Sequence, residues 1–93
     1  MIRSFADAET ERLWRTGRSK RLPGDLLGRA KRKLAILDGA TDLRDLASPP
    51  GNRLERLHGG REGQHSIRIN DQWRICFRWD NADAFDVEVT DYH

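Results

Sequence analysis

The stretch Gln64–Trp79 constrains the fold most, because it has the pattern of two strands joined by a tight turn. Its second half alternates between two sets of side chains: Trp73, Ile75, Phe77 and Trp79 against Arg74, Cys76 and Arg78. A period of two is the spacing of a half-buried strand. Asn70-Asp71 supplies the turn, since both residue types tolerate left-handed backbone angles. We therefore predict a hairpin with one apolar face toward the core and one face with Arg68, Arg74 and Arg78.

Two helices are predicted before the hairpin. Asp7 is a suitable N-cap and Gly17 a suitable C-terminal stop for a helix over residues 8–16. Pro23-Gly24-Asp25 begins a second helix, in which leucines and alanine recur at helical spacing, and Gly39 ends it.

The remaining segments are short. They predict a first strand at Ile2–Phe5, a helical turn at Thr41–Leu46, a loop at Ser48–Gly51, a strand at Arg53–Leu57 and a last strand at Ala84–Thr90 with Phe85, Val87 and Val89 on one face. The expected class is α+β, with the N-terminal strand and two helices packed on one face of a C-terminal antiparallel sheet, in one domain over residues 1–93.

Composition excludes several classes of protein. Hydrophobic residues make up 37% of the chain and charged residues 34%, which is typical of a globular protein and not of a disordered one. No apolar run approaches the roughly 18 residues that a membrane span needs. The N-terminus lacks the apolar core of a signal peptide, and the single Cys76 suits a reducing compartment. We expect a cytoplasmic protein without membrane association.

Charge is unevenly distributed. Residues 12–33 contain one acid, Asp25, and nine bases: Arg12, Arg15, Arg18, Lys20, Arg21, Arg29, Lys31, Arg32 and Lys33. Residues 80–91 contain five acids and no base. A basic stretch of this density favours a polyanionic partner, here nucleic acid, over a merely solvated helix face.

The chain has few residues that can do chemistry. It lacks a glycine-rich phosphate loop and the Cys/His spacing of a metal site, and nothing near Cys76 indicates an activated thiolate. Three histidines, the strand arginines and the final Asp91-Tyr92-His93 remain. His65 shares the parity of Ile67, which indicates packing. The set suits RNA cleavage, in which a base removes the 2′-hydroxyl proton and arginine stabilises the phosphorane charge.

The runs Pro50–Trp79 and Val87–His93, with the N-x-Q-W-R core at Asn70–Arg74, resemble the HigB-type toxins of the RelE/ParE superfamily. The resemblance covers essentially the whole chain. It implies a small α+β ribonuclease that cuts mRNA on the ribosome without a metal or other cofactor. It also implies a HigA-type helix-turn-helix antitoxin as partner, which connects the toxin indirectly with operator DNA.

The resemblance also implies roles for single residues. Arg74 binds the scissile phosphate. The terminal triplet Asp91, Tyr92 and His93 provides acid/base and base-stacking groups. Supporting RNA contacts are expected from His58, Arg68, Gln72 and Arg78, and the basic stretch is expected to contact ribosomal RNA or to be masked by the antitoxin.

Two positions depart from the family pattern. His58-Gly59-Gly60 stands where the family usually has Lys-Gly-Asp, so a proton carrier replaces a permanent cation. Glu55 stands where some members have a catalytic histidine, and it offers a base but no cation. Two other functions stay open: a non-enzymatic ParE-like gyrase poison, and an attenuated toxin that mainly binds its antitoxin.

Overall fold

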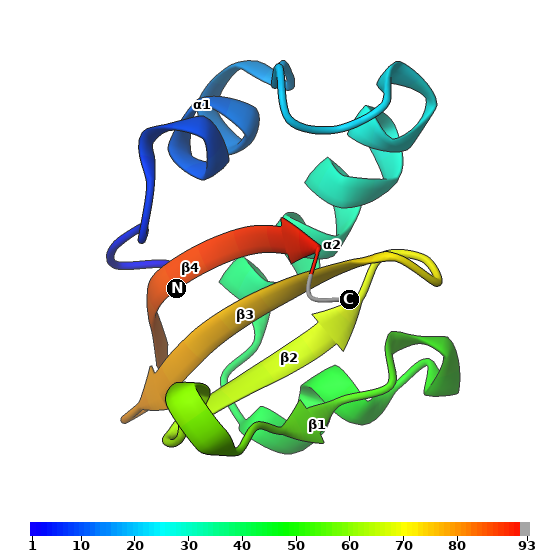
Figure 1. The fold of residues 1–93 in the computed structure, drawn as a ribbon. Coiled ribbons are helices and arrows are strands. Elements are labelled where there is room, and N and C mark those ends of the chain that lie inside the picture. The colour runs from blue at the N-terminus through cyan, green and yellow to red at the C-terminus, as the bar shows by residue number, and fades with distance from the viewer. Residues whose placement is uncertain (92–93) are drawn as a thin grey trace.

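The computed structural model describes residues 1–91, and its centre is a four-stranded antiparallel sheet in the order β1-β2-β3-β4 (Figure 1). The strands are β1 (Glu55–Arg56), β2 (Gln64–Arg68), β3 (Trp73–Asp80) and β4 (Asp83–Asp91). The predicted hairpin is confirmed as β2 and β3. Its register places Ile67 opposite Ile75 and Arg68 opposite Arg74, as the alternating pattern requires.

Both predicted helices are present, as α1 (Ala8–Thr16) and α2 (Leu27–Gly39). The Asp7 side chain accepts a hydrogen bond from the Thr10 N–H at the start of α1, and Gly17 ends the helix in the left-handed region with φ 76°. A 3-10 turn at Gly24–Leu26 leads into α2. The predicted turn near residue 43 is a 3-10 helix, Leu43–Ala47.

The helices pack against one face of the sheet (Figure 1). Buried residues of both layers form one cluster, which includes Leu13, Ala30, Leu34, Leu37, Ile67, Ile75, Phe77, Val87 and Val89. Trp73 and Trp79 contribute to the same core. His65 stacks on Phe77 with ring centroids 6.1 Å apart, and its partial burial lowers its pKa, so the packing assignment is correct. The α+β class and its layer arrangement are confirmed.

The predicted N-terminal strand is not formed as a strand. Ile2–Phe5 runs parallel to β4 but pairs with it only through two isolated bridges, Ile2 with Ala84 and Phe5 with Val87. The interruption lies at Asp86, whose backbone has a positive φ of 53° and whose N–H donates to the Ser4 hydroxyl. A β-bulge in β4 therefore breaks the ladder that would otherwise extend between the bridges.

Because of the same bulge, the prediction that Phe85, Val87 and Val89 share one face of the last strand is wrong. Phe85 pairs with Arg78 and lies on the opposite face from Val87 and Val89, while Ala84 takes the buried position. The register between β3 and β4 shifts opposite Phe77 because β4 has one residue more there.

The segment before β2 also differs from its prediction. Arg53–Leu57 contributes only the two paired residues of β1, since Arg53 has φ 45° and cannot join a ladder. The expected loop at Ser48–Gly51 leads into a 3-10 turn, Pro50–Asn52. The Asn52 side chain is fully buried and donates to the carbonyls of Leu46 and Ser48, which fixes this turn.

Across residues 1–91, no helix is long and apolar enough to cross a membrane.

Candidate active site

Arg74 is held in place on the sheet face that the helices leave uncovered. Its Nε donates to the Ser66 hydroxyl over 2.8 Å, and its Nη2 donates to the Arg53 carbonyl over 2.6 Å. Only 12% of the Arg74 side chain is exposed. Ser66 is the fully buried neighbour on β2 with the parity of Arg74. The guanidinium is therefore fixed before any substrate arrives.

Glu55 of β1 lies beside this cation. Its Oε1 is 3.6 Å from Arg74 Nη1, and about half of its side chain (51%) is exposed to solvent. A carboxylate next to a fixed guanidinium is the arrangement that proton removal beside a phosphate requires. The sequence suggested Glu55 as a base, and the structure places it next to Arg74.

Gln72 and Asp91 meet at the end of the sheet near the β2–β3 turn. The Gln72 side-chain amide donates to Asp91 Oδ2 over 2.7 Å. Asp91 is the cross-strand partner of Trp73, whereas Thr90 is the partner of Arg74. Asp91 is thus one residue out of phase with Arg74. Tyr92 and His93, which were expected to complete this site, lie outside the described residues.

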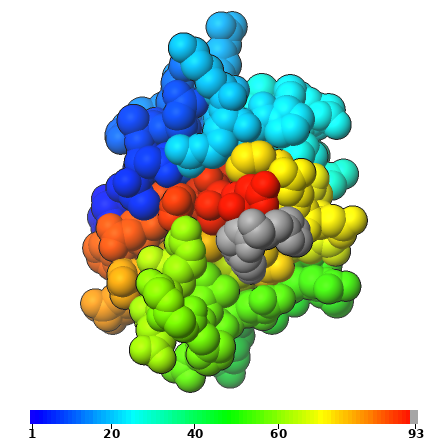
Figure 2. Space-filling model, viewed as in Figure 1, coloured from blue at the N-terminus to red at the C-terminus, as the bar shows by residue number. Residues whose placement is uncertain are grey.

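The connection between β1 and β2 passes in front of this face, and Figure 2 shows it beside β4. Arg61 ties it down, since its Nη1 lies 3.0 Å from Glu88 Oε1 of β4 and donates to Gln64. Cys76 is completely buried on this face. Burial raises the pKa of its thiol, in agreement with the absence of an activated thiolate.

Arg78 lies away from Arg74, although both belong to β3 and share a face. Four residues of strand separate them, roughly 13 Å. Arg78 forms an ion pair with Asp86, with Nε and Oδ2 3.4 Å apart. Arg68, in contrast, is the direct cross-strand partner of Arg74. The structure therefore brings Arg68, Gln72 and Asp91 to the Arg74 end of the sheet and leaves Arg78 at the other end.

His58 borders a separate small pocket of about 220 Å³, lined by Arg56, Leu57, His58, Glu62 and Gly63. Its backbone is extended and precedes the short 3-10 turn Gly59–Arg61. In the described part of the chain, no hydrogen bond or ion pair joins His58 to Arg74. His58 is exposed and lies on the same β1–β2 connection that follows Glu55.

The first half of the basic stretch is largely neutralised. Acids just ahead of it form ion pairs with its bases: Glu9 with Arg12 (3.8 Å), Glu11 with Arg15 (2.7 Å) and Asp7 with Arg21 (2.9 Å). Burial acts to raise the pKa of Asp7, but hydrogen bonds from Arg21 and Thr10 lower it overall. The excess of positive charge counted between residues 12 and 33 is therefore larger than the unneutralised charge that α1 offers to a partner.

The second half of the basic stretch, which lies on α2, is not neutralised in this way. Arg29, Arg32 and Lys33 of α2 line a groove of about 390 Å³ together with Arg68 of β2. Arg29 Nη1 approaches the Ile69 carbonyl at 3.5 Å, and Lys33 Nζ donates to the Asn52 side chain. Within residues 1–91, none of these three α2 cations forms an ion pair with an acid.

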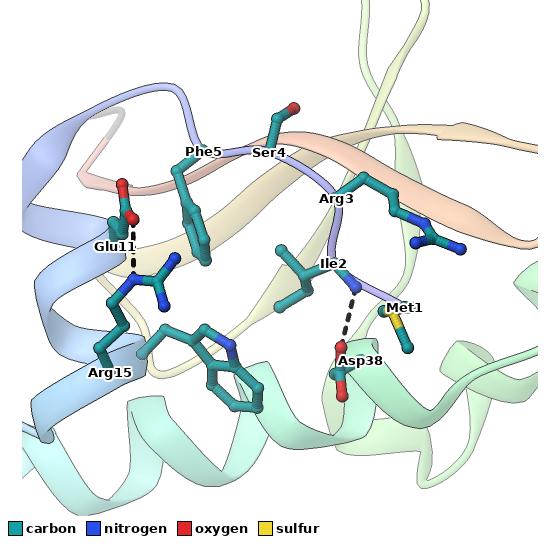
Figure 3. Close-up of a pocket in the computed structure, with 9 residues that line it drawn as sticks. Met1, Ile2, Arg3, Ser4, Phe5, Glu11, Arg15 and Asp38 are labelled. Carbon is teal, nitrogen blue, oxygen red and sulfur yellow. Dashed lines mark hydrogen bonds and ion pairs between the residues drawn. The ribbon is translucent and has the colours of Figure 1, made fainter.

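A larger pocket, of about 570 Å³, lies between the N-terminal segment and the helices (Figure 3). Ile2 and Phe5 supply apolar walls, and the Ile2 N–H donates to Asp38 over 2.8 Å. Glu11 and Arg15 at its rim neutralise each other. The pocket has no fixed cation beside an available base, so its groups do not form a cleavage site.

Residues 1–91 contain no group of three or more His, Cys, Asp or Glu side chains that could hold a metal ion. The site residues that the sequence did not single out are Ser66, Arg61 and Glu88. Ser66 could have been found, because it is polar, lies on the neighbouring strand of the predicted hairpin and has the parity of Arg74. Arg61 and Glu88 could not, because a loop brings them together across the sheet.

Known proteins with similar sequences and folds belong to the family that the sequence resembles. Residues 3–93 match the family described as the RelE-like toxin HigB of type II toxin–antitoxin systems. The chain is 41% identical over 80 residues to Toxin HigB-1 of Vibrio cholerae, covering 85% of this chain and 84% of the relative. It is 33% identical over 93 residues to Endoribonuclease HigB of Proteus vulgaris, covering 100% of both. The fold is similar to a chain of the YoeB-YefM complex from Staphylococcus aureus, with TM-score 0.62, 14% identity, and coverage of 100% of this chain and 98% of that one.

Proposed function

This chain belongs to the HigB-like family of RelE-type toxins, and we propose from that premise that it is an endoribonuclease that cuts mRNA on the ribosome and so inhibits translation. The observation that supports the proposal best is the fixed guanidinium of Arg74 with the carboxylate of Glu55 at 3.6 Å. A cation and a base at one point are what cleavage of an RNA phosphodiester bond requires.

In the proposed reaction, Glu55 removes the proton of a ribose 2′-hydroxyl. The 2′-oxygen forms a bond to the adjacent phosphorus while the bond from phosphorus to the 5′-oxygen breaks. Arg74 stabilises the negative charge that collects on the non-bridging oxygens. The departing 5′-oxygen takes a proton, and the products are a cyclic phosphate and a free 5′-hydroxyl.

The C-terminal residues are proposed to complete the site. Asp91 and His93 are the proposed acid/base groups that exchange protons with the leaving oxygen, and Tyr92 is proposed to stack on a base of the substrate. Gln72 holds the Asp91 carboxylate. Arg68 and His58 are proposed as supporting RNA contacts. Arg78, at the far end of β3, can support only a more distant part of the RNA.

The proposed partners follow from the family. They are an antitoxin of the helix-turn-helix HigA type, operator DNA through that antitoxin, and the ribosome with its mRNA, in the cytoplasm. The basic stretch is proposed to contact RNA on the ribosome, with the α1 cations limited by their own ion pairs.

The proposal is tested by mapping mRNA 5′ ends after brief expression of the chain without antitoxin. The Arg74→Ala variant is the loss-of-function arm. Arg44→Ala is the matched control, because the Arg44 side chain is 90% exposed and forms its ion pair with Asp42, two residues away in the chain. We expect new ends within translated frames for the wild type and the control, no new ends for Arg74→Ala, and none when translation is blocked.

Other outcomes would replace the proposal. Growth arrest with intact mRNA and blocked DNA supercoiling would identify a gyrase poison. A folded chain that causes neither arrest nor cleavage would be an attenuated toxin that mainly binds its antitoxin.

A further inference from the structure

A basic groove lies between α2 and the β2–β3 turn, and Glu55 is not among the residues that line it. It is lined by four cationic residues, Arg29, Arg32, Lys33 and Arg68, and by Gly51, Ile69 and Asn70. Among residues 1–91, no acid lines the groove, whose volume is about 390 Å³.

The α2 cations of this groove are close together without a counter-charge. Burial, followed by the charges of Arg29 and Arg32, lowers the pKa of Lys33. Arg29 and Lys33 are one helical turn apart, a spacing at which like charges repel. In the described chain, the acids of α1 pair with α1 and its loop, and none reaches these three residues. An anion bound here would relieve the repulsion.

Arg68 connects the groove with Arg74. It lines the groove and is also the direct cross-strand partner of Arg74, at the end of the sheet where β2 turns into β3. Its present partner is the carboxylate of Asp71, which is 95% exposed, so this contact can be exchanged for another anion at small cost. A chain of anions that touches Arg74 can therefore continue around the turn through Arg68 to α2.

We propose that this groove binds backbone phosphates of the RNA strand that is being cut, on one side of the scissile phosphate. The inference rests on the proposed function, because it takes the strand at Arg74 to be RNA. A phosphodiester backbone fits better than a single anion, since four cationic side chains from two elements, α2 and β2, line one groove and guanidinium groups bind phosphate oxygens in pairs. The remaining basic residues of the basic stretch are proposed to contact ribosomal RNA.

The test measures binding alone, by fluorescence anisotropy with RNA whose 2′-oxygens are methylated and cannot attack. A trinucleotide bound at Arg74 also meets its cross-strand neighbour Arg68, whereas a decamer is long enough to extend along the α2 cations. The variant combines Arg29→Gln with Arg32→Gln and keeps Lys33, which holds the buried Asn52. The control combines Arg3→Gln with Arg44→Gln, which removes the same charge outside the groove. Thermal melts show that each variant is folded.

We expect the wild type and the control to bind the decamer more tightly than the trinucleotide, and the groove variant to lose this gain. The slope of log affinity against log salt for the decamer should become shallower by about 1.4, from two phosphate contacts at about 0.7 each. Trinucleotide binding should stay the same.

Three results would overturn the inference: no gain with length in the wild type, an equal loss in the control, or a groove variant that binds the decamer as tightly as the wild type does. The test is separate from that of the proposed function. A groove effect in a chain that cuts nothing would contradict only the nuclease, and cleavage without a groove effect would contradict only the groove.

Discussion

Arg74 and the three α2 cations Arg29, Arg32 and Lys33 have the same charge but opposite surroundings. Arg74 is 12% exposed and is held by a hydroxyl, a carbonyl and a carboxylate. The α2 cations, within the described residues, have no ion pair, and they repel one another. A cation fixed at one point can stabilise charge that develops there, whereas cations without a carboxylate partner suit a flexible backbone whose phosphates vary in position.

The comparison predicts first that Arg74→Lys loses most of the cleavage activity although the charge is kept. An ammonium cannot donate to Ser66 and Arg53 in the planar geometry of a guanidinium, so the cation loses its position. We expect the rate to fall by about 10²–10³, the effect of removing one fixed transition-state donor. The measurement is single-turnover cleavage of an mRNA in a translation mixture, with Arg44→Lys as control. A rate equal to wild type would show that charge alone is sufficient.

Ser66→Ala tests whether the hydrogen bond that fixes the Arg74 guanidinium contributes to cleavage. Ser66 is fully buried and its hydroxyl accepts the hydrogen bond that Arg74 Nε donates, so we describe it as a positioning residue. Loss of one buried hydrogen bond costs about 1–1.5 kcal/mol, and we expect a similar rise in the cleavage barrier, roughly tenfold in rate.

A double-mutant cycle separates positioning from stability. In an Arg74→Lys background, Ser66→Ala should lower the unfolding free energy but should no longer change the cleavage rate. A tenfold loss that persists in that background would mean that Ser66 acts by another route.

The Arg74 region was largely predictable, because it depends on local alternation. Parity in the run from Gln64 to Trp79 placed Arg68 and Arg74 side by side and away from the core, as the register shows. The helix caps Asp7 and Gly17 were predictable for the same reason, since each acts on its nearest neighbours in the chain.

The rest depended on contacts between distant segments. The bulge at Asp86 turned Phe85 to the other face, and an aspartate with positive φ has no distinctive sequence signal. The α1 acids lie just before the window in which the charges were counted, so their ion pairs were missed. Arg78 shared the parity of Arg74, but parity says nothing about distance along the strand.

A third prediction concerns stability, where the two regions should respond in opposite directions. Ser66→Ala destabilises the protein because it removes the buried hydroxyl that accepts a hydrogen bond from Arg74 Nε. Arg29→Gln should stabilise it, by about 0.2–0.5 kcal/mol, because it relieves repulsion with Lys33 one turn away and sacrifices only a long 3.5 Å contact to Ile69. Urea unfolding of both variants beside the wild type measures the two signs. A destabilised Arg29→Gln would show that the α2 cations are structurally supported after all.

The smallest predicted effect is the pH dependence of the stabilisation that Arg29→Gln produces. Burial and the neighbouring arginines lower the pKa of Lys33 below its ordinary value of 10.5. At a pH between the lowered pKa of Lys33 in the folded protein and its ordinary pKa in the unfolded chain, the unfolded chain binds more protons than the folded one. The wild type therefore gains stability as pH rises through this window, until Lys33 is neutral in both states. The repulsion that Arg29→Gln relieves is then gone. The stability advantage of Arg29→Gln over the wild type should therefore be largest near neutral pH and should shrink toward pH 10.5, as urea titrations at the two ends of the window can show. An advantage that stays constant across the window would place the repulsion between Arg29 and Arg32, neither of which loses its charge there.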